Sequence, residues 1–217
     1  MLADMKKLVE GFVRDETTRL SADDIETAIS LATQRYDQDR PRTKVEDVVS
    51  AGGDTLPLPA SWATESELVS VEHPVGEYPA CYLPGSIYTA PSGDLLRIGD
   101  VLSSGVECRL TFTVPHVVSG VVDTIPGSNR EAVAAYAAAL LLEQLSAAAI
   151  NDGDSTIMAD STDRRTKSQE YASRARGLKA RYTEALGIGS GASTQAAGTT
   201  VAWPSRARLT SGIYRHG

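Results

Sequence analysis

The sequence predicts an α+β protein: a helical bundle of three to four helices with an inserted small antiparallel β module and a long extended C-terminal tail. Two observations predict this class. Apolar residues recur at helical spacing near both ends of the chain, whereas the middle consists of short alternating segments separated by turns rich in Pro and Gly. We therefore expect bundle helices in residues 1–43 and 119–187, the β module in 44–118 and the tail in 188–217.

Two helices are expected at the start of the chain. Apolar residues at near-helical spacing predict a short helix over 2–14. The second begins at Ser21-Ala-Asp-Asp24, a capping box with Asp in the usual Glu position, and Pro41 ends it. Its apolar stripe consists of Ile25, Ala28, Ile29, Ala32 and Tyr36.

The β module is expected as a series of short strands, at 68–73, 80–83, 87–89, 95–98 and 106–114. Strands this short and sequential favour an antiparallel meander or small sandwich over a parallel sheet. Residues 56–59, Leu-Pro-Leu-Pro, predict an extended segment. Cys81 and Cys108 are too few for a disulfide framework, so both are expected to be small buried hydrophobes.

A third helix is expected from the capping box Ser128-Asn-Arg-Glu131 to about Ile150. It is rich in alanine, and its only charges beside Arg130 are Glu131 and Glu143. A helix so apolar around its circumference must be covered on more than one side. It is expected to be the central core helix, with a subunit contact on a second face as the further possibility. The sequence contains no uninterrupted run of about 18 apolar residues, so we expect no membrane span. The N-terminus lacks the features of a signal peptide. We therefore expect a protein of the reducing cytoplasm.

A fourth helix is expected over 163–186, with an apolar stripe and with Gly187 just past its end. The stripe consists of Tyr171, Ala175, Leu178, Tyr182 and Ala185. Residues 187–200 are low in complexity, and the stretch after them mixes large apolar residues with Arg. This arrangement is typical of a docking peptide that orders on a partner, and a disordered tail is the alternative.

Charge divides the chain into two regions of opposite sign. Residues 161–217 hold ten Lys/Arg against three acids, a formal +7, whereas residues 1–160 hold eleven against 25, a formal −14. Such a division predicts two surfaces for two different partners. The residues expected to contact an acidic protein partner are Arg174, Arg176, Lys179, Arg181, Trp203, Arg206, Arg208, Tyr214 and Arg215.

No pattern of catalytic or metal-binding residues is found. The three histidines, His73, His116 and His216, are far apart without metal-ligand spacing, and the first two are expected to be structural. Nucleophile-elbow, P-loop and HExxH patterns are absent from the sequence. We expect no enzyme and no cofactor. Tyr171 and Tyr182 lie on the apolar stripe, so packing is expected for them instead of stacking on bases.

The order of elements resembles the head–tail adaptor (connector) proteins of tailed bacteriophages. The resemblance lies in the helix 21–37 ending in Asp39-Arg-Pro-Arg42, the β segments 68–76 and 109–116, the helix start 125–143 and, most specifically, 152–182. It covers roughly residues 15–187 and leaves out the tail 188–217. The β insert is large compared with the purely helical members of that family.

The resemblance implies a non-catalytic virion protein of the neck, made in the host cytoplasm. It implies a ring, usually dodecameric, docked beneath the portal protein, which extends the DNA channel and offers a platform for stopper or tail proteins. The acidic body would let genomic DNA slide past without sequence-specific contact. The basic helix would pair with a neighbouring copy or the portal, and the tail would clasp the portal. A stopper or tail-completion protein, and a nucleic-acid-binding regulator using 164–182, are the alternatives.

Overall fold

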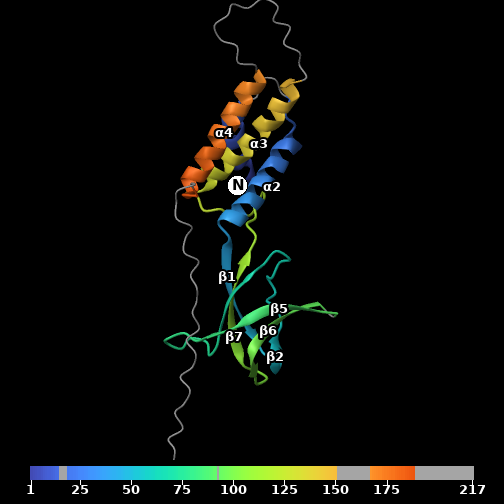
Figure 1. Ribbon diagram of the computed structural model, residues 1–217, viewed down its shortest axis with the longest axis vertical. Helices are drawn as coiled ribbons and strands as arrows, with labels where there is room; N and C mark the ends of the chain where they lie inside the picture. The colour runs from blue at the N-terminus through green and yellow to red at the C-terminus, as the bar shows by residue number, and fades with distance from the viewer. Residues whose placement is uncertain (15–18, 92, 151–166, 189–217) are drawn as a thin grey trace, which may run out of the picture. The chain divides into compact units, whose positions relative to one another are not determined.

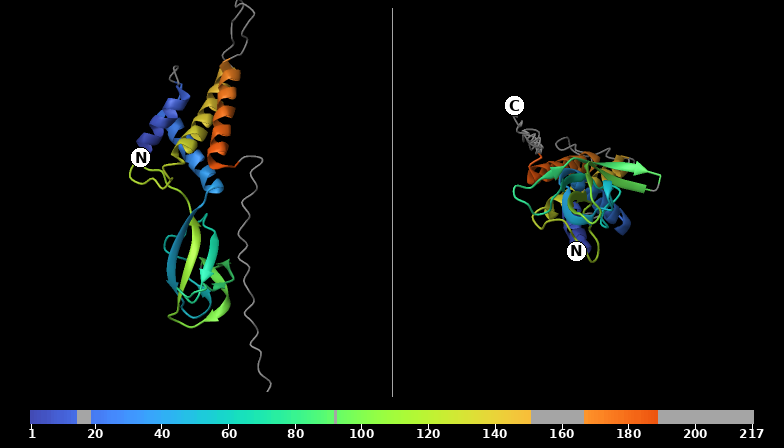
Figure 2. Two further views of the ribbon diagram at one scale, coloured as in Figure 1. Left: turned by 90° about the vertical axis from the view of Figure 1, so that its left-hand side faces the viewer. Right: turned by 90° about the horizontal axis from the view of Figure 1, so that it is seen from below.

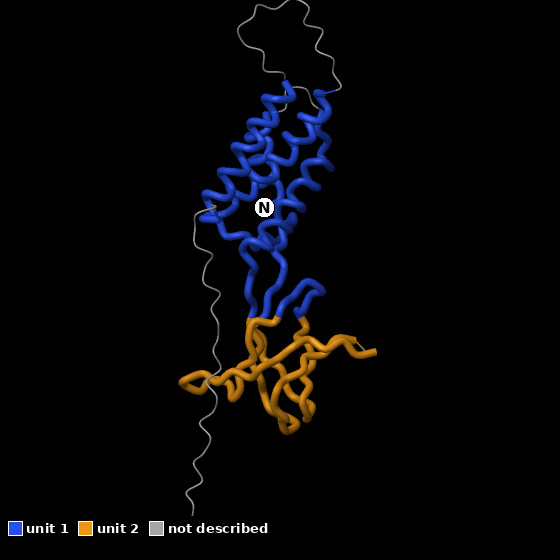
Figure 3. Tube along the Cα trace, viewed as in Figure 1, with its two compact units in different colours: residues 1–44, 61–67, 112–192 blue, residues 45–60, 68–111, 193–217 orange. Residues whose placement is uncertain are grey.

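The computed structural model describes residues 1–14, 19–91, 93–150 and 167–188 (Figure 1). In this part the fold is mixed α+β, with four helices and two small antiparallel sheets, as the sequence predicted for the α+β class. The chain divides into two compact units (Figure 3). We call the described residues within 1–44, 61–67 and 112–192 the helical unit, and those within 45–60 and 68–111 the β unit.

The first two helices form where local signals predict them. Helix α1 is Leu2–Val13 and helix α2 is Ala22–Asp39. The predicted capping box of α2 is confirmed: the Asp24 main-chain N–H donates to Ser21 Oγ at 3.1 Å, and the Ser21 N–H donates to Asp24 Oδ2 at 2.8 Å. These bonds satisfy amide groups that have no partner inside the helix.

Helix α3, Arg130–Ile150, is the centre of the helical unit. It packs against α1, α2 and the last helix, α4, and it lies between α4 and the α1–α2 pair in both side views (Figures 1 and 2). This confirms that the helix is covered on more than one side. Its buried residues are Ala132, Val133, Ala134, Ala135, Ala137, Ala138, Ala139, Leu141, Leu142 and Leu145.

By length and composition α3 is also the one helix of the described residues that could cross a membrane, although half of it is buried inside the protein. That result differs from the sequence expectation, which required an uninterrupted apolar run. A core helix of this kind passes the same test, so the packing of α3 is a sufficient reason for its apolar character.

The start of α3 differs from the predicted capping box. The helix begins at Arg130, and the two side chains expected to cap it bond elsewhere. The Ser128 hydroxyl donates to Asn129 Oδ1 at 3.2 Å, and the Glu131 carboxylate accepts from Arg181 of α4. The amide of Asn129 in turn donates to the Tyr36 hydroxyl at 2.7 Å. The side chains of the predicted cap therefore bond to a neighbouring residue and to α4.

Helix α4 is described from Lys167 to Leu186, so its predicted start at 163 lies outside the described residues. Its buried side is that of the predicted stripe, with one correction: Ala185 is exposed and Leu186 is buried. Gly187, with φ of +67°, confirms the predicted end. Its N–H donates to Glu184 O at 3.0 Å and the Ile188 N–H donates to Thr183 O at 2.8 Å, the two bonds of a Schellman motif.

Seven strands make the two sheets. The four-stranded sheet has the order β1 (Arg42–Val49), β7 (Glu107–Val114), β3 (Leu68–Glu72), β4 (Tyr82–Leu83). The three-stranded sheet has the order β2 (Gly53–Leu56), β6 (Gly93–Leu102), β5 (Gly85–Ala90). The pairs β3–β4, β2–β6 and β5–β6 are antiparallel. Along β7 every second residue is buried, which confirms the alternation read from the sequence.

The two cysteines differ from each other. Cys108 on β7 is fully buried as predicted, and burial raises the pKa of its thiol. The prediction for Cys81 is wrong, because this residue is exposed. It directly precedes β4, a two-residue strand at the edge of its sheet, where a single main-chain bond from the His73 N–H to Cys81 O, 3.0 Å, continues the pairing.

Candidate interaction surfaces

The basic side chains of α4 are the first candidate surface, and Arg174 contacts another helix. Its guanidinium donates to the main-chain oxygens of Phe12, at 2.9 Å, and Val13, at 3.3 Å. Both oxygens belong to the last turn of α1, where carbonyl groups have no partner inside the helix and the helix dipole favours a cation. Arg174 therefore acts as a cap for α1.

Lys179 and Arg181 pair with the two acidic side chains of α3. Lys179 Nζ lies 2.7 and 2.9 Å from the carboxylate oxygens of Glu143, and Arg181 donates to the carboxylate of Glu131. The Arg181 guanidinium also lies 5.2 Å from the centre of the Phe12 ring, a cation–π distance. The basic charge on this side of α4 is thus matched within the helical unit.

Arg176 differs from these three residues. It is exposed, and its Nε donates to the main-chain oxygen of Ala172 in its own helix at 3.3 Å. Of the four described candidates, three thus contact a second helix, and a role for any of the four in binding a partner stays a prediction. The other five predicted contacts, Trp203, Arg206, Arg208, Tyr214 and Arg215, lie outside the described residues.

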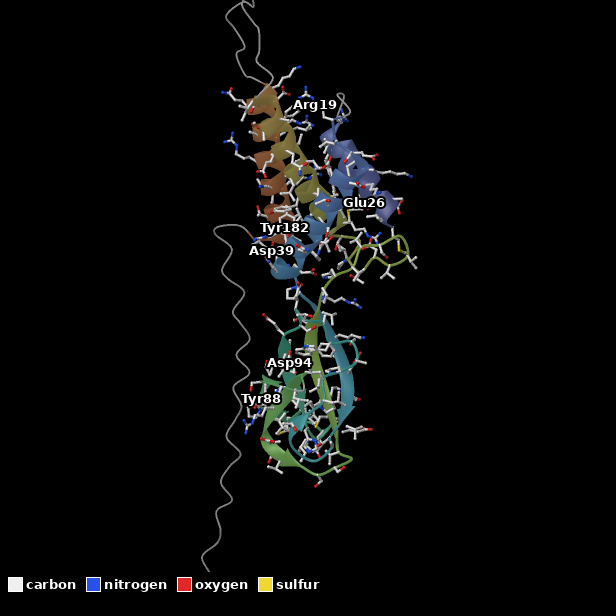
Figure 4. The ribbon with its side chains drawn as sticks, turned by 90° about the vertical axis from the view of Figure 1, so that its right-hand side faces the viewer. Arg19, Glu26, Asp39, Tyr88, Asp94 and Tyr182 are labelled. Atoms are coloured by element: carbon white, nitrogen blue, oxygen red, sulfur yellow. The ribbon has the colours of Figure 1, made fainter. Side chains whose placement is uncertain are left out.

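A partly buried cluster joins the ends of α2 and α4 (Figure 4). The Tyr182 hydroxyl donates to Asp39 Oδ2 at 2.7 Å, and Arg35 Nε donates to the same oxygen at 2.9 Å. Burial, and then the bond to Asp39, raise the pKa of Tyr182 well above its usual range. Arg40 donates to the main-chain oxygen of Leu186, which ties the last turn of α4 to α2. The expectation that Tyr182 is packed is confirmed, because only 1% of it is exposed.

His116 is a second connecting point in the helical unit. Its main-chain N–H donates to Asp37 Oδ1 at 2.6 Å. Its ring Nδ1 lies 3.1 Å from Thr124 Oγ1, its Nε2 lies 3.2 Å from Arg40 O, and the ring centre is 4.9 Å from that of Tyr36. A histidine this enclosed, 9% exposed, fits the structural role predicted for it.

Beside His116 the helical unit has a groove that the sequence did not predict. Two hollows of about 420 and 380 Å³ share Gln34, Asp37 and Glu65. We call them together the α2 groove. It is lined by one face of α2, by residues of the 61–67 segment and by the chain on either side of His116: Leu2, Glu26, Ile29, Ser30, Thr33, Gln34, Asp37, Gln38, Pro41, Glu65, Glu67, Thr113, Pro115, His116, Val117 and Val118.

The α2 groove is acidic. Four carboxylates line it, and no Lys or Arg is among its described lining residues. Within the described part of the chain, Glu26 alone of the four has a basic partner, Lys6, which lies outside the lining. Burial raises the pKa of Asp37, the contacts with His116 oppose that effect, and the nearby Glu65 carboxylate adds to it. The sequence signal was partial: the polar face of α2 is readable, but nothing local indicates that 61–67 returns to it.

The described residues include no group of three His, Cys, Asp or Glu side chains that could hold a metal ion. Compared with protein-family models and with curated proteins, the chain matches none.

Proposed function

We propose that this protein is a structural virion protein, a head–tail adaptor that forms a ring beneath the portal, connects capsid to tail and extends the DNA channel. One observation carries the proposal. The β unit is inserted between α2 and α3, while helices from both sides of the insertion pack on α3. This is the element order implied by the resemblance to adaptor proteins.

In the proposed assembly the four helices form the bundle typical of that family, and copies of the chain pack side by side in a dodecameric ring. The alanines of α3 permit close helix packing. Acidic residues dominate the first 160 positions, so a channel lined by them repels phosphates and lets genomic DNA pass without sequence-specific contact. The partners are the portal, neighbouring copies, and tail or stopper proteins below.

The contact with the portal is proposed mainly for the C-terminal tail. Since Arg174, Lys179 and Arg181 have partners within the helical unit, the predicted contact residues that remain for another protein are Arg176 and those beyond residue 188. Trp203, Arg206, Arg208, Tyr214 and Arg215 are the proposed anchors. An extended peptide repeated around a ring gains affinity from the number of copies.

The test of the whole proposal is the position of the protein in the particle. Phage particles carrying a labelled copy are imaged at low resolution, and the label is expected at a single capsid vertex. Label elsewhere, or none, contradicts the proposal. Heads made without tail genes separate an adaptor, which co-purifies with portal, from a stopper, which does not.

Two further measurements test parts of the proposal. Deletion of 188–217 is expected to abolish occupancy on DNA-filled heads, and unchanged occupancy contradicts the role given to the tail. Titration of the purified protein with DNA at physiological salt is expected to show no binding. Salt-dependent binding would favour a nucleic-acid-binding regulator instead.

A further inference from the structure

We propose that the α2 groove binds the Arg-rich C-terminal segment, residues 201–217, of the same molecule. The groove has the size of an ordinary ligand site, with two hollows of about 420 and 380 Å³. The segment also contains the proposed portal anchors, so the inference concerns the protein before it meets another protein. It does not depend on the proposed function.

Charge complementarity is the first argument. Within the described part of the chain, the carboxylates of Glu65 and Glu67 have no basic partner, and Asp37 accepts only from the main chain of His116. Three carboxylates face one groove, and two of them lie close enough for Glu65 to raise the pKa of Asp37. A guanidinium placed among them would remove this repulsion and could bond two oxygens at once.

The supply of unmatched cations is the second argument. The described bases of α4 that face the helical unit already have partners. Residues 201–217 hold Arg206, Arg208 and Arg215 and no acid. Trp203 and Leu209 could fill the apolar part of the groove, which Ile29 and Val118 line.

The place where α4 ends is the third argument. The main-chain oxygen of Leu186 accepts from Arg40, and Arg40 O lies 3.2 Å from the ring of His116, which lines the groove. The described end of the chain after α4 thus lies near one end of the groove. Arg206 comes eighteen positions after Ile188, enough for about 60 Å when the chain is extended. A short tether makes the local concentration of the segment roughly millimolar.

Tryptic cleavage of the full-length protein tests the inference, because trypsin cuts after Arg206 and Arg208. Mass spectrometry follows the fragments that begin at residues 207 and 209. In E65Q/E67Q the cleavage is expected to be about fivefold faster than in the wild type, as loss of two ion pairs predicts. The matched control E10Q/E77Q removes two exposed acids outside the groove and is expected to cleave at the wild-type rate.

Two outcomes overturn the inference: equal cleavage rates in all three proteins, or protection that increases with protein concentration, which indicates the tail of another copy. Hydrogen exchange gives a second measurement in case a groove variant fails to fold. Exchange of the amides in 34–38 is expected to increase in R206Q/R208Q and to stay unchanged in R206K/R208K. Unchanged exchange in R206Q/R208Q also overturns it.

Discussion

The helical unit and the β unit bury their apolar residues very differently. Twenty buried residues form one cluster around α3, to which α1, α2 and α4 all contribute. The β unit has a smaller core, and eight of its large apolar side chains are exposed, as many as in the larger helical unit: Val45, Val49, Val69, Tyr78, Tyr82, Ile87, Tyr88 and Val101. The difference teaches that the helical unit has one large core closed by its own helices, whereas the smaller β unit buries less for the number of apolar side chains that it exposes.

The largest effect is expected from opening the closed core. Leu142 of α3 is fully buried, and Leu142→Ala should lower the free energy of unfolding by about 2–5 kcal/mol through lost burial and a cavity. Chemical denaturation measures it. Leu31→Ala is the control, since Leu31 is 47% exposed on α2 and should change stability by less than about 0.5 kcal/mol. Equal losses in the two variants would contradict the central position of α3.

The next effect tests packing within the β unit. A β carbon on Gly99 would lie 2.6 Å from Pro84 Cγ, so Gly99→Ala should cost about 1–3 kcal/mol. Gly11→Ala in α1 is the comparison: nothing lies within 4 Å of its added β carbon, and helix propensity predicts a gain of up to about 1 kcal/mol. Thermal melts of both variants should therefore shift in opposite directions. An unchanged melting temperature in Gly99→Ala would show that the β unit is loosely packed around Gly99.

A smaller effect is expected at the junction of α2 and α4. Tyr182→Phe removes the donor to Asp39 and should cost about 1–2 kcal/mol at neutral pH. The pKa of Tyr182 is raised in the folded protein, so above about pH 10 the unfolded chain loses this proton and the folded chain keeps it. Wild-type stability should fall with rising pH there, and the variant should lack that component. Parallel pH profiles of the two proteins would refute this.

The smallest effect concerns the exposed ion pair between Lys179 and Glu143. A double-mutant cycle with Lys179→Ala and Glu143→Ala should give a coupling of about 0.2–1 kcal/mol, decreasing in high salt. A coupling above about 2 kcal/mol would mean that charge pairing, and not apolar packing, closes the helical unit. The ion pair would then contribute to the stability of the helical unit as much as a buried apolar side chain does.

Local signals predicted much of the fold. The cap at Ser21, the end at Gly187 and the alternation along β7 depend on neighbours within a few residues, and all are confirmed. Strand β2 was not predicted: it begins at Gly53 and has only four residues. Such a strand depends on its partner β6 more than on its own propensity.

The candidate surfaces were less predictable, because they depend on contacts between distant parts of the chain. The bases of α4 were readable as a charged stretch, but their partners on α1 and α3 are not encoded by spacing. Ser128 and Glu131 matched a capping pattern, but Glu131 accepts from Arg181 of α4. Glu65 and Glu67 line the α2 groove although strands β1 and β2 separate them from α2 in the sequence. No local sequence pattern predicts this contact.

The unequal exposure of the two cysteines has a practical consequence. The thiolate is the form that reacts with maleimides, and Cys108 is enclosed with its thiol pKa raised. Cys81 is exposed, and these two are the only cysteines of the chain. The natural sequence thus carries one chemical handle, placed in the β unit, so a gold cluster or a fluorophore can be attached there without engineering the protein.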